Sequence, residues 1–267
     1  MSFLTGKATQ PIITPERIDK NRYRAPLFFG AIAVAAAMFS IPMFLTGSTT
    51  TALAMIYLAV FIVSYAVSSW CLKYFLSAGR TYWSHDSHQV VMTTPTGMLL
   101  FEVGVPLLGV LGVPLAAVAW LLHRQGDWIG SAALAALGAL SLPYLLQALQ
   151  GVRPVRRRII VSKSGIELTQ ANGHRHEIPW TEHPRLIGVH QADAVIVLKN
   201  HRETRYPIGY LPLSMRQFER LLNTFSTDGR LRARISGPEA LSTVLAVLEP
   251  TEEERTDGSW TWSRRSR

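Results

Sequence analysis

Residues Met98 to Leu122 read MLLFEVGVPLLGVLGVPLAAVAWLL, an apolar run in which Glu102 is the single charged residue. About 20 residues at 1.5 Å rise each are enough for a helix to cross the hydrocarbon core of a bilayer. Three other runs have the same character, from Pro26 to Leu45, from Thr51 to Leu72 and from Trp128 to Leu149. Because backbone in lipid must satisfy its own hydrogen bonds, the sequence predicts an α-helical transmembrane bundle of four spans over residues 25–150.

The overall composition agrees with a membrane protein and excludes several classes of soluble protein. Of the 267 residues, 48% are hydrophobic and only 17% are charged. Cys71 is the single cysteine, which excludes an intramolecular disulfide framework and any multi-cysteine zinc or iron–sulfur site; no cofactor is expected. The net charge of +9 comes from membrane-proximal and terminal segments rather than from one recognition element, so no nucleic-acid partner is expected.

The distribution of basic residues predicts the orientation in the membrane. Residues 1–24 are polar and charged, so they form a cytoplasmic N-terminal segment rather than a secretory signal. Basic residues precede span one and follow spans two and four, and these positions all fall on one side. By the positive-inside rule, both termini of this multi-pass protein are expected in the cytoplasm, and the chain in the cytoplasmic membrane. Trp120 and Trp128 are expected at the outer interface, with Tyr74, Tyr82 and Trp83 at the inner one.

Two features within the spans are candidates for a role beyond spanning. Glu102 is an intramembrane acid, which by default indicates proton or ion handling. Since residues 103–122 are long enough to span alone, Glu102 is instead expected at the cytoplasmic edge as a structural acid. Small residues recur in span four at Ser131, Ala135 and Ala139, a spacing that lets helix backbones approach closely. They are expected to pack within the bundle, with docking on a partner's helices as the alternative.

The connection between spans two and three contains the histidine pair His85 and His88. Two histidines three positions apart can supply two ligands to a divalent ion if the segment is helical. No cysteine and no compact Glu or His motif supplies further ligands, so a hydrated interfacial loop without a metal site is expected. Ser87, which lies between the histidines, lacks the strand–turn–helix setting of a catalytic nucleophile.

After span four the apolar pattern changes from the helical period to that of short strands. Six strands are expected, at Ile159–Ser162, Ile166–Gln170, His174–Trp180, Leu186–His190, Ala194–Lys199 and Thr204–Ile208. Asn172 and Gly173 mark a hairpin turn. Ser214 and Gln217 form a capping box that begins an amphipathic helix, and a second box at residues 236–239 begins another.

Two short motifs give these strands a family resemblance. Ser164-Gly165-Ile166-Glu167-Leu168 in the second strand and Glu177-Ile178-Pro179-Trp180 at the end of the third, followed by the capping helix, resemble bacterial pleckstrin-homology-like (PH-like) domains tethered to membrane helices. The resemblance covers about residues 153–226. It implies a small, partly open antiparallel β barrel on the cytoplasmic side, which serves for binding and has no shared catalytic set. Residues 227–250 are expected to add a helix, and residues 251–267 a flexible tail.

Four arginines lie where the last span leaves the bilayer: Arg153, Arg156, Arg157 and Arg158. Each basic residue near an anionic leaflet adds about 1 kcal/mol of attraction. These arginines are therefore candidates for lipid contact, and setting the topology alone is the other interpretation.

The C-terminal tail combines aromatic and basic side chains at Trp260, Trp262, Arg264 and Arg265. Such a combination is suited to lipid headgroups or to the surface of another protein. An interfacial anchor and a frayed end are both open interpretations of this segment.

Three classes of function remain, and the first is the main prediction. It is a non-catalytic integral membrane protein that binds or assembles partners, protein or anionic lipid, through its PH-like domain. The second is an accessory or structural subunit of a large membrane complex, such as a respiratory supercomplex or an envelope-synthesis assembly. The third is a small membrane enzyme or transporter that uses Glu102, His85 and His88. The expected partners are membrane lipids and other integral membrane proteins, and no catalytic residue is nominated.

Overall fold

The computed structural model describes residues 12–46, 49–86, 88–122, 128–150, 157–170, 173–190, 193–199, 203–207 and 211–256, and the chain forms two compact units. The sheet unit consists of Met1–Asn21, Phe75–Thr94 and Val155–Arg267. The span unit consists of Arg22–Tyr74 and Pro95–Pro154. Three stretches of the sheet unit lie outside the predicted domain at residues 153–226: one before the first span, one between spans two and three, and the residues after 226.

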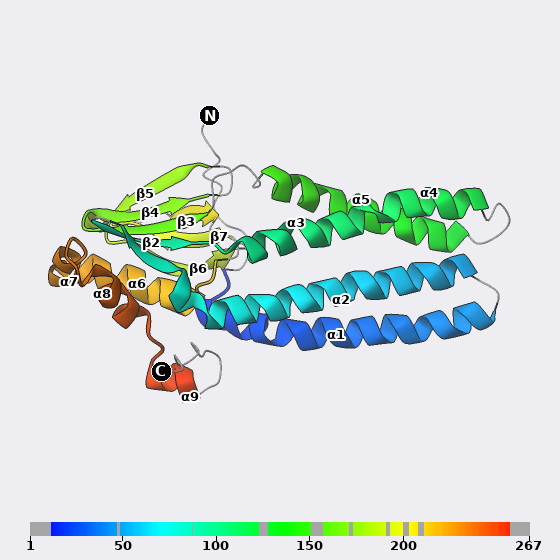
Figure 1. The fold of residues 1–267 in the computed structure, drawn as a ribbon, viewed down its shortest axis with the longest axis horizontal. Helices are drawn as coiled ribbons and strands as arrows, with labels where there is room; N and C mark the ends of the chain where they lie inside the picture. Colours follow the sequence, from blue (N-terminus) through cyan, green and yellow to red (C-terminus); the bar gives the residue numbers. More distant parts are fainter. Residues whose placement is uncertain are drawn as a thin grey trace. The chain divides into compact units, whose positions relative to one another are not determined.

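The described residues contain four helices that are long and apolar enough to cross a membrane, as the sequence predicts. They are α1 (Pro15–Leu45), α2 (Thr49–Ser77), the consecutive pair α3 (Thr96–Val110) and α4 (Gly112–Leu122), and α5 (Trp128–Gln150). The third span breaks at Leu111 between α3 and α4, close to Pro114, which has no N–H to donate to the carbonyl of Val110. Both α3 and α4 pack along α5 (Figure 1).

The described part of the sheet unit has a five-stranded antiparallel sheet, ordered β1-β2-β3-β4-β5, and a three-stranded antiparallel sheet, ordered β6-β7-β8. The first sheet contains β1 (Trp83–Asp86), β2 (Gln89–Thr93), β3 (Arg158–Ser162), β4 (Gly165–Thr169) and β5 (Arg175–Pro179). The second contains β6 (Arg185–His190), β7 (Asp193–Val197) and β8 (Glu203–Pro207). Strands β3 to β8 confirm the six that the alternating pattern predicts.

The segment between the second and third spans is a β hairpin rather than the expected loop, although His85, Asp86 and His88 are exposed as a hydrated segment would be. β1 pairs with β2, and β2 pairs in turn with β3, with Thr93 opposite Arg158. The physical reason is burial, because Val90 and Met92 are both 0% exposed in the core of the sheet unit. Trp83 is also buried there, so its expected place at the inner membrane interface is wrong. The helices α3 to α5 are thus inserted between two neighbouring strands.

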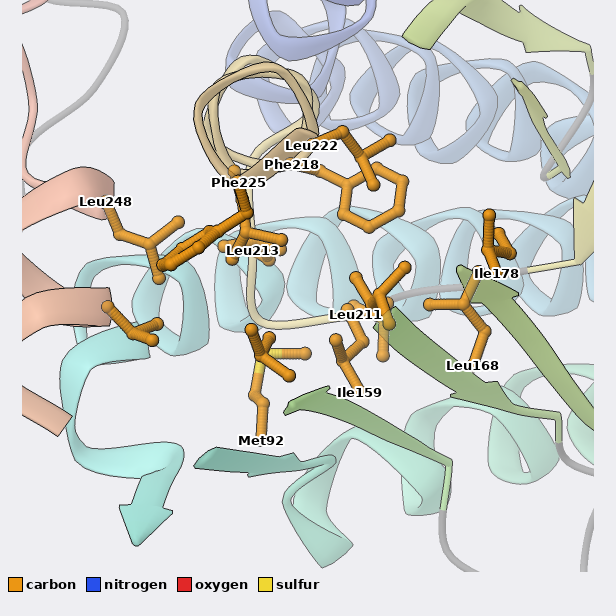
Figure 2. Close-up of a cluster of buried hydrophobic side chains, with 14 of the residues drawn as sticks. Met92, Ile159, Leu168, Ile178, Leu211, Leu213, Phe218, Leu222, Phe225 and Leu248 are labelled. Carbon is orange, nitrogen blue, oxygen red and sulfur yellow. The ribbon is translucent and has the colours of Figure 1, made fainter. Parts of the chain in front are cut away.

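The core of the sheet unit forms where α6 (Met215–Thr227) meets the strands. Figure 2 shows Phe218, Leu222 and Phe225 of α6 close to side chains of β2, β3, β4 and β5. The predicted capping box begins this helix: Ser214 Oγ accepts from the N–H of Gln217, and Gln217 Oε1 accepts from the N–H of Ser214. The side chain of Gln217 also donates to the carbonyl of Leu248 at 2.7 Å, which joins the end of the helix Ala240–Leu248 to α6.

Three shorter helices follow α6, namely α7 (Gly229–Arg234), α8 (Ala240–Leu248) and α9 (Glu252–Thr256). The predicted second amphipathic helix is α8, and it packs against α6, β1 and β2. Glu239 precedes it without a side-chain capping bond, so the expected box at residues 236–239 does not form. The beginning of the tail is helical rather than flexible, because Glu254 is 8% exposed and its Oε2 accepts from Nη1 of Arg220 at 3.0 Å.

Candidate functional site

The outer face of the first sheet presents a row of four residues, which we name the basic row: Thr93, Arg158, Thr169 and Arg175. Each member lies opposite the next on the neighbouring strand, from β2 through β3 and β4 to β5. Cross-strand partners share one face of a sheet, and successive residues alternate between faces. The adjacent residues Met92, Ile159 and Leu168 belong to the buried core (Figure 2). The row therefore lies on the opposite face of the sheet.

The side chains of the basic row differ in exposure. Arg158 and Arg175 are exposed, Thr93 is half-buried, and Thr169 is 7% exposed between the two arginines. The hydroxyl of Thr169 donates to Oε1 of Glu167 at 3.2 Å. The Nε of Arg175 lies 3.6 Å from the same oxygen, with 72% of the arginine side chain exposed. An exposed pair of this kind contributes about 0–1 kcal/mol, so Arg175 can exchange Glu167 for another anion.

The next row along the strands carries the opposite charge. Glu167 and Glu177 lie opposite each other on β4 and β5, and Ile160 of β3 lies opposite Glu167. On β2 and β3, this row is farther along the chain from the inserted helices than the basic row is. The face therefore changes from basic to acidic with distance from the points where the chain leaves for the spans.

The four arginines singled out from the sequence do not share one environment. Arg158 belongs to the exposed basic row, whereas Arg157 is half-buried and its carbonyl oxygen accepts from Thr94. Arg153 and Arg156 lie outside the described residues, as do Trp260, Trp262, Arg264 and Arg265 of the tail. Their expected contact with lipid or protein stays a prediction.

The residues just before α1 and in its first two turns are attached to the rest of the sheet unit by backbone and side-chain bonds. Ile13 exchanges two backbone hydrogen bonds with Val189 of β6, at 2.9 and 3.1 Å. Asp19 is 4% exposed, and its two carboxylate oxygens accept from the N–H groups of Met215 and Arg216, each at 3.1 Å. A carboxylate is favourable at this position because the N-terminus of a helix carries partial positive charge. The N-terminal segment is thus part of the sheet unit.

Within the span unit, helix contact centres on the break in the third span. The hydroxyl of Tyr57 on α2 donates to the carbonyl oxygen of Leu108 on α3. A Cβ atom built on Gly138 of α5 would lie 2.8 Å from the backbone nitrogen of Val113 on α4, so these two helices approach as closely as a glycine allows. Small residues therefore permit the contact, as helix packing in lipid requires.

The expected packing stripe of span four is partly buried in the described span unit. Ser131 is 6% exposed, Ala135 is half-buried and Ala139 is exposed. The buried face of α5 follows Leu134 and Gly138 instead. Glu102 lies in the second turn of α3 and is half-buried, and its assignment as a structural acid stays a prediction.

The histidine pair does not have the helical geometry that a shared metal ion would need. His85 is an exposed residue of β1, and His88 is exposed in the turn of the same hairpin. Among the residues that the structure describes, no group of three His, Cys, Asp or Glu side chains is arranged to hold a metal ion.

A second polar cluster lies between the edges of the two sheets. The Nε2 atoms of Gln170 and His176 are 2.6 Å apart, and the ring of His176 meets Tyr206 of β8 edge-on at 5.4 Å. Burial lowers the pKa of His176, and the charge of nearby His174 lowers it further. Burial also raises the pKa of Asp193, against the opposing influence of Arg205 and His190.

Comparison of the chain with models of protein families, with curated proteins and with solved structures finds no match. The candidate site therefore rests on the geometry of its own residues. Sequence reasoning missed Thr93, Thr169, Arg175 and Asp19. Thr93 and Asp19 depend on contacts between distant segments. Thr169 and Arg175 face each other across the local β4–β5 hairpin, but nothing in their sequence marks them as a site. The short apolar run Val90-Val91-Met92, with two β-branched residues between polar neighbours, is the local sign that β2 is a strand.

Proposed function

We propose that the chain is a non-catalytic integral membrane protein whose sheet unit is a PH-like binding domain on the cytoplasmic side. In this proposal, the unit binds or assembles partners, either protein or anionic lipid, next to the membrane. The observation that carries the proposal is the composition of the sheet unit. It is assembled from three chain segments, and a pair of candidate spans separates each segment from the next.

The order of these segments supports an even number of membrane crossings, with the sheet unit on one side of the membrane. Residues 12–21, 75–94 and 157–256 belong to one folded unit. If the intervening pairs of helices cross the membrane, this supports each pair leaving and returning on the same side. Lys and Arg are more numerous in these segments than in the loops at residues 46–50 and 123–127, which join the other ends of the helices. By the positive-inside rule, this difference favours the cytoplasmic side for the sheet unit. Two small antiparallel sheets with α6 packed into their core support the PH-like, partly open barrel.

An accessory role in a larger membrane complex is the second candidate, and the surface of the span helices favours it. Large apolar side chains such as Leu27 and Phe39 of α1 and Leu140 of α5 are exposed in the single chain. Lipid tails cover such faces as well as a partner's helices do, because apolar burial gives no preference between them. The two candidates therefore differ in which unit touches the partner.

Site-specific photo-crosslinking in cells tests both candidates. A photoreactive amino acid replaces exposed sheet-unit residues, Arg185 or Lys199, or exposed span residues, Phe39 or Leu140. The binding proposal expects one recurring protein or lipid adduct from the sheet unit. A protein adduct from the span positions supports the accessory role. If neither set gives a recurring adduct, while the chain stays in the membrane fraction after alkaline washing, both candidates are wrong.

The orientation is tested by cysteine labelling, because Cys71 is the single cysteine of the chain. In a Cys71→Ser background, Lys163→Cys on the sheet unit is expected to react with an impermeant maleimide only after the membrane is opened. Gln125→Cys between the third and fourth spans is expected to react in intact cells. The reverse pattern would place the sheet unit outside and contradict the proposed orientation.

A further inference from the structure

We propose that the basic row, and Arg158 with Arg175 in particular, binds the phosphate group of an anionic lipid in the adjacent leaflet. This inference rests on the proposed function, because it requires the span unit to lie in the membrane. It names the lipid chemistry that the sheet unit recognises and the side chains that recognise it.

Chain length keeps the row near the membrane surface. Thr93 ends β2, and the third candidate span begins at Thr96. Three residues extend at most about 11 Å, at 3.3–3.6 Å each. Thr93 and its neighbour Arg158 are therefore within about 11 Å and one strand spacing of the beginning of a span. With Glu102 at the cytoplasmic edge of the hydrocarbon core, the six residues from Thr96 to Glu102 add about 9 Å at 1.5 Å rise each. Thr93 is therefore tethered within about 20 Å of that edge, just outside a headgroup layer of about 5–8 Å.

The side chains suit a phosphate monoanion. β3 and β5 are separated by one strand, so the Cα atoms of Arg158 and Arg175 are about 10 Å apart on one face. Two long guanidinium side chains can converge from that distance, and each can donate two parallel hydrogen bonds to phosphate oxygens. The Thr93 hydroxyl adds a donor beside Arg158. Among the described residues Arg158 has no ion-pair partner, and Arg175 has only the weak contact with Glu167.

The order of charges along the strands agrees with an anionic surface next to the basic row. This row lies at the ends of β2 and β3 that the chain connects to the spans. The acidic row with Glu167 and Glu177 lies two residues farther along the strands, about 7 Å at 3.3 Å per residue. A carboxylate close to anionic headgroups would be repelled, whereas an arginine is attracted. Solvation alone would not require the charges to be sorted in this order.

The test measures lipid adducts on the full chain by native mass spectrometry from a mild detergent. The detergent contains equal amounts of phosphatidylglycerol and phosphatidylcholine with the same acyl chains. The wild-type chain is expected to prefer phosphatidylglycerol. Arg158→Gln with Arg175→Gln removes both charges and keeps part of each aliphatic stem. It is expected to lower this preference about thirtyfold, and each single substitution about fivefold.

A matched control removes two arginines elsewhere on the sheet unit. Arg185→Gln with Arg230→Gln leaves the same net charge, and both positions are exposed. This control is expected to keep the wild-type preference. If it loses the preference equally, or if the double variant of the row keeps it, the proposal is wrong. The single variants give the same answer if the double variant of the row does not fold.

Adding inorganic phosphate as a competitor tests whether the basic row binds a lipid headgroup or a soluble phosphate. Millimolar phosphate is expected to leave the phosphatidylglycerol adducts in place, and their displacement would overturn the lipid assignment. The crosslinking and alkaline-wash results do not depend on the row, so a wrong basic row and a wrong membrane-protein proposal give different outcomes.

Discussion

Thr94 donates two hydrogen bonds to the carbonyl oxygen of Arg157, one from its backbone N–H and one from its hydroxyl, each at 3.1 Å. The two residues are 63 positions apart, and the chain between them contains the third and fourth candidate spans. This contact joins the residue that follows β2 to the residue that precedes β3, where the chain leaves the sheet for the inserted helices and returns to it. A helical insertion can thus leave a sheet without separating the neighbouring strands.

The Thr94 hydroxyl is expected to stabilise this junction. Thr94 is 1% exposed, and Thr94→Val keeps its shape but removes one of the two bonds. We expect a loss of about 1 kcal/mol in the free energy of unfolding, measured by denaturant titration in detergent. Thr227→Val is the control, because its hydroxyl is exposed at the end of α6. An equal effect of both substitutions would show that the Thr94–Arg157 bond has no special role.

The attachment of the N-terminal segment depends on Asp19. Asp19→Ala removes a buried carboxylate that caps two N–H groups of α6, so we expect a loss of about 1–2 kcal/mol in the same titration. Glu16→Gln is the matched control on the same helix. Its exposed carboxylate pairs with Arg216 at 2.8 Å, and such surface pairs contribute about 0–1 kcal/mol. A loss from Glu16→Gln as large as that from Asp19→Ala would contradict the capping role.

Stability of the sheet unit is expected to depend on pH through His176. Its pKa is lowered in the folded state, so the unfolded chain binds the proton more readily. The stabilisation from neutral His176 is fully present above pH 6.5, the ordinary pKa of histidine. It declines as the pH falls below 6.5 toward the lower pKa of the folded state. His176→Gln should remove most of the change in melting temperature between pH 5 and 6.5. His174→Gln should make this change smaller. An unchanged slope in His176→Gln would assign the dependence to another group.

The predictable parts of the fold are those that local patterns encode. Span length follows from the apolar runs, the six strands from alternation, and the beginning of α6 from the Ser214–Gln217 box. The hairpin at residues 83–93 was missed because β2 finds its partner β3 beyond the inserted helices. The same non-local pairing adds Thr93 to the basic row, and of the four members only Arg158 is a candidate from sequence. The acidic run at residues 252–254 predicts a solvated, flexible tail, whereas in the structure Glu254 forms an ion pair with Arg220.

The last prediction concerns the close approach of α4 and α5. A leucine at Gly138 would place its Cβ 2.5 Å from Cγ2 and 2.8 Å from the backbone nitrogen of Val113, so the helices must separate. We expect Gly138→Leu to cost about 1–3 kcal/mol, as overpacking of a close contact does. The adjacent Ala139 is exposed and offers the control Ala139→Leu, which adds the same kind of side chain facing lipid. Thermal unfolding in detergent should therefore show a lower midpoint for Gly138→Leu and little change for Ala139→Leu. The opposite order would place the packed face of α5 on the stripe of Ser131, Ala135 and Ala139.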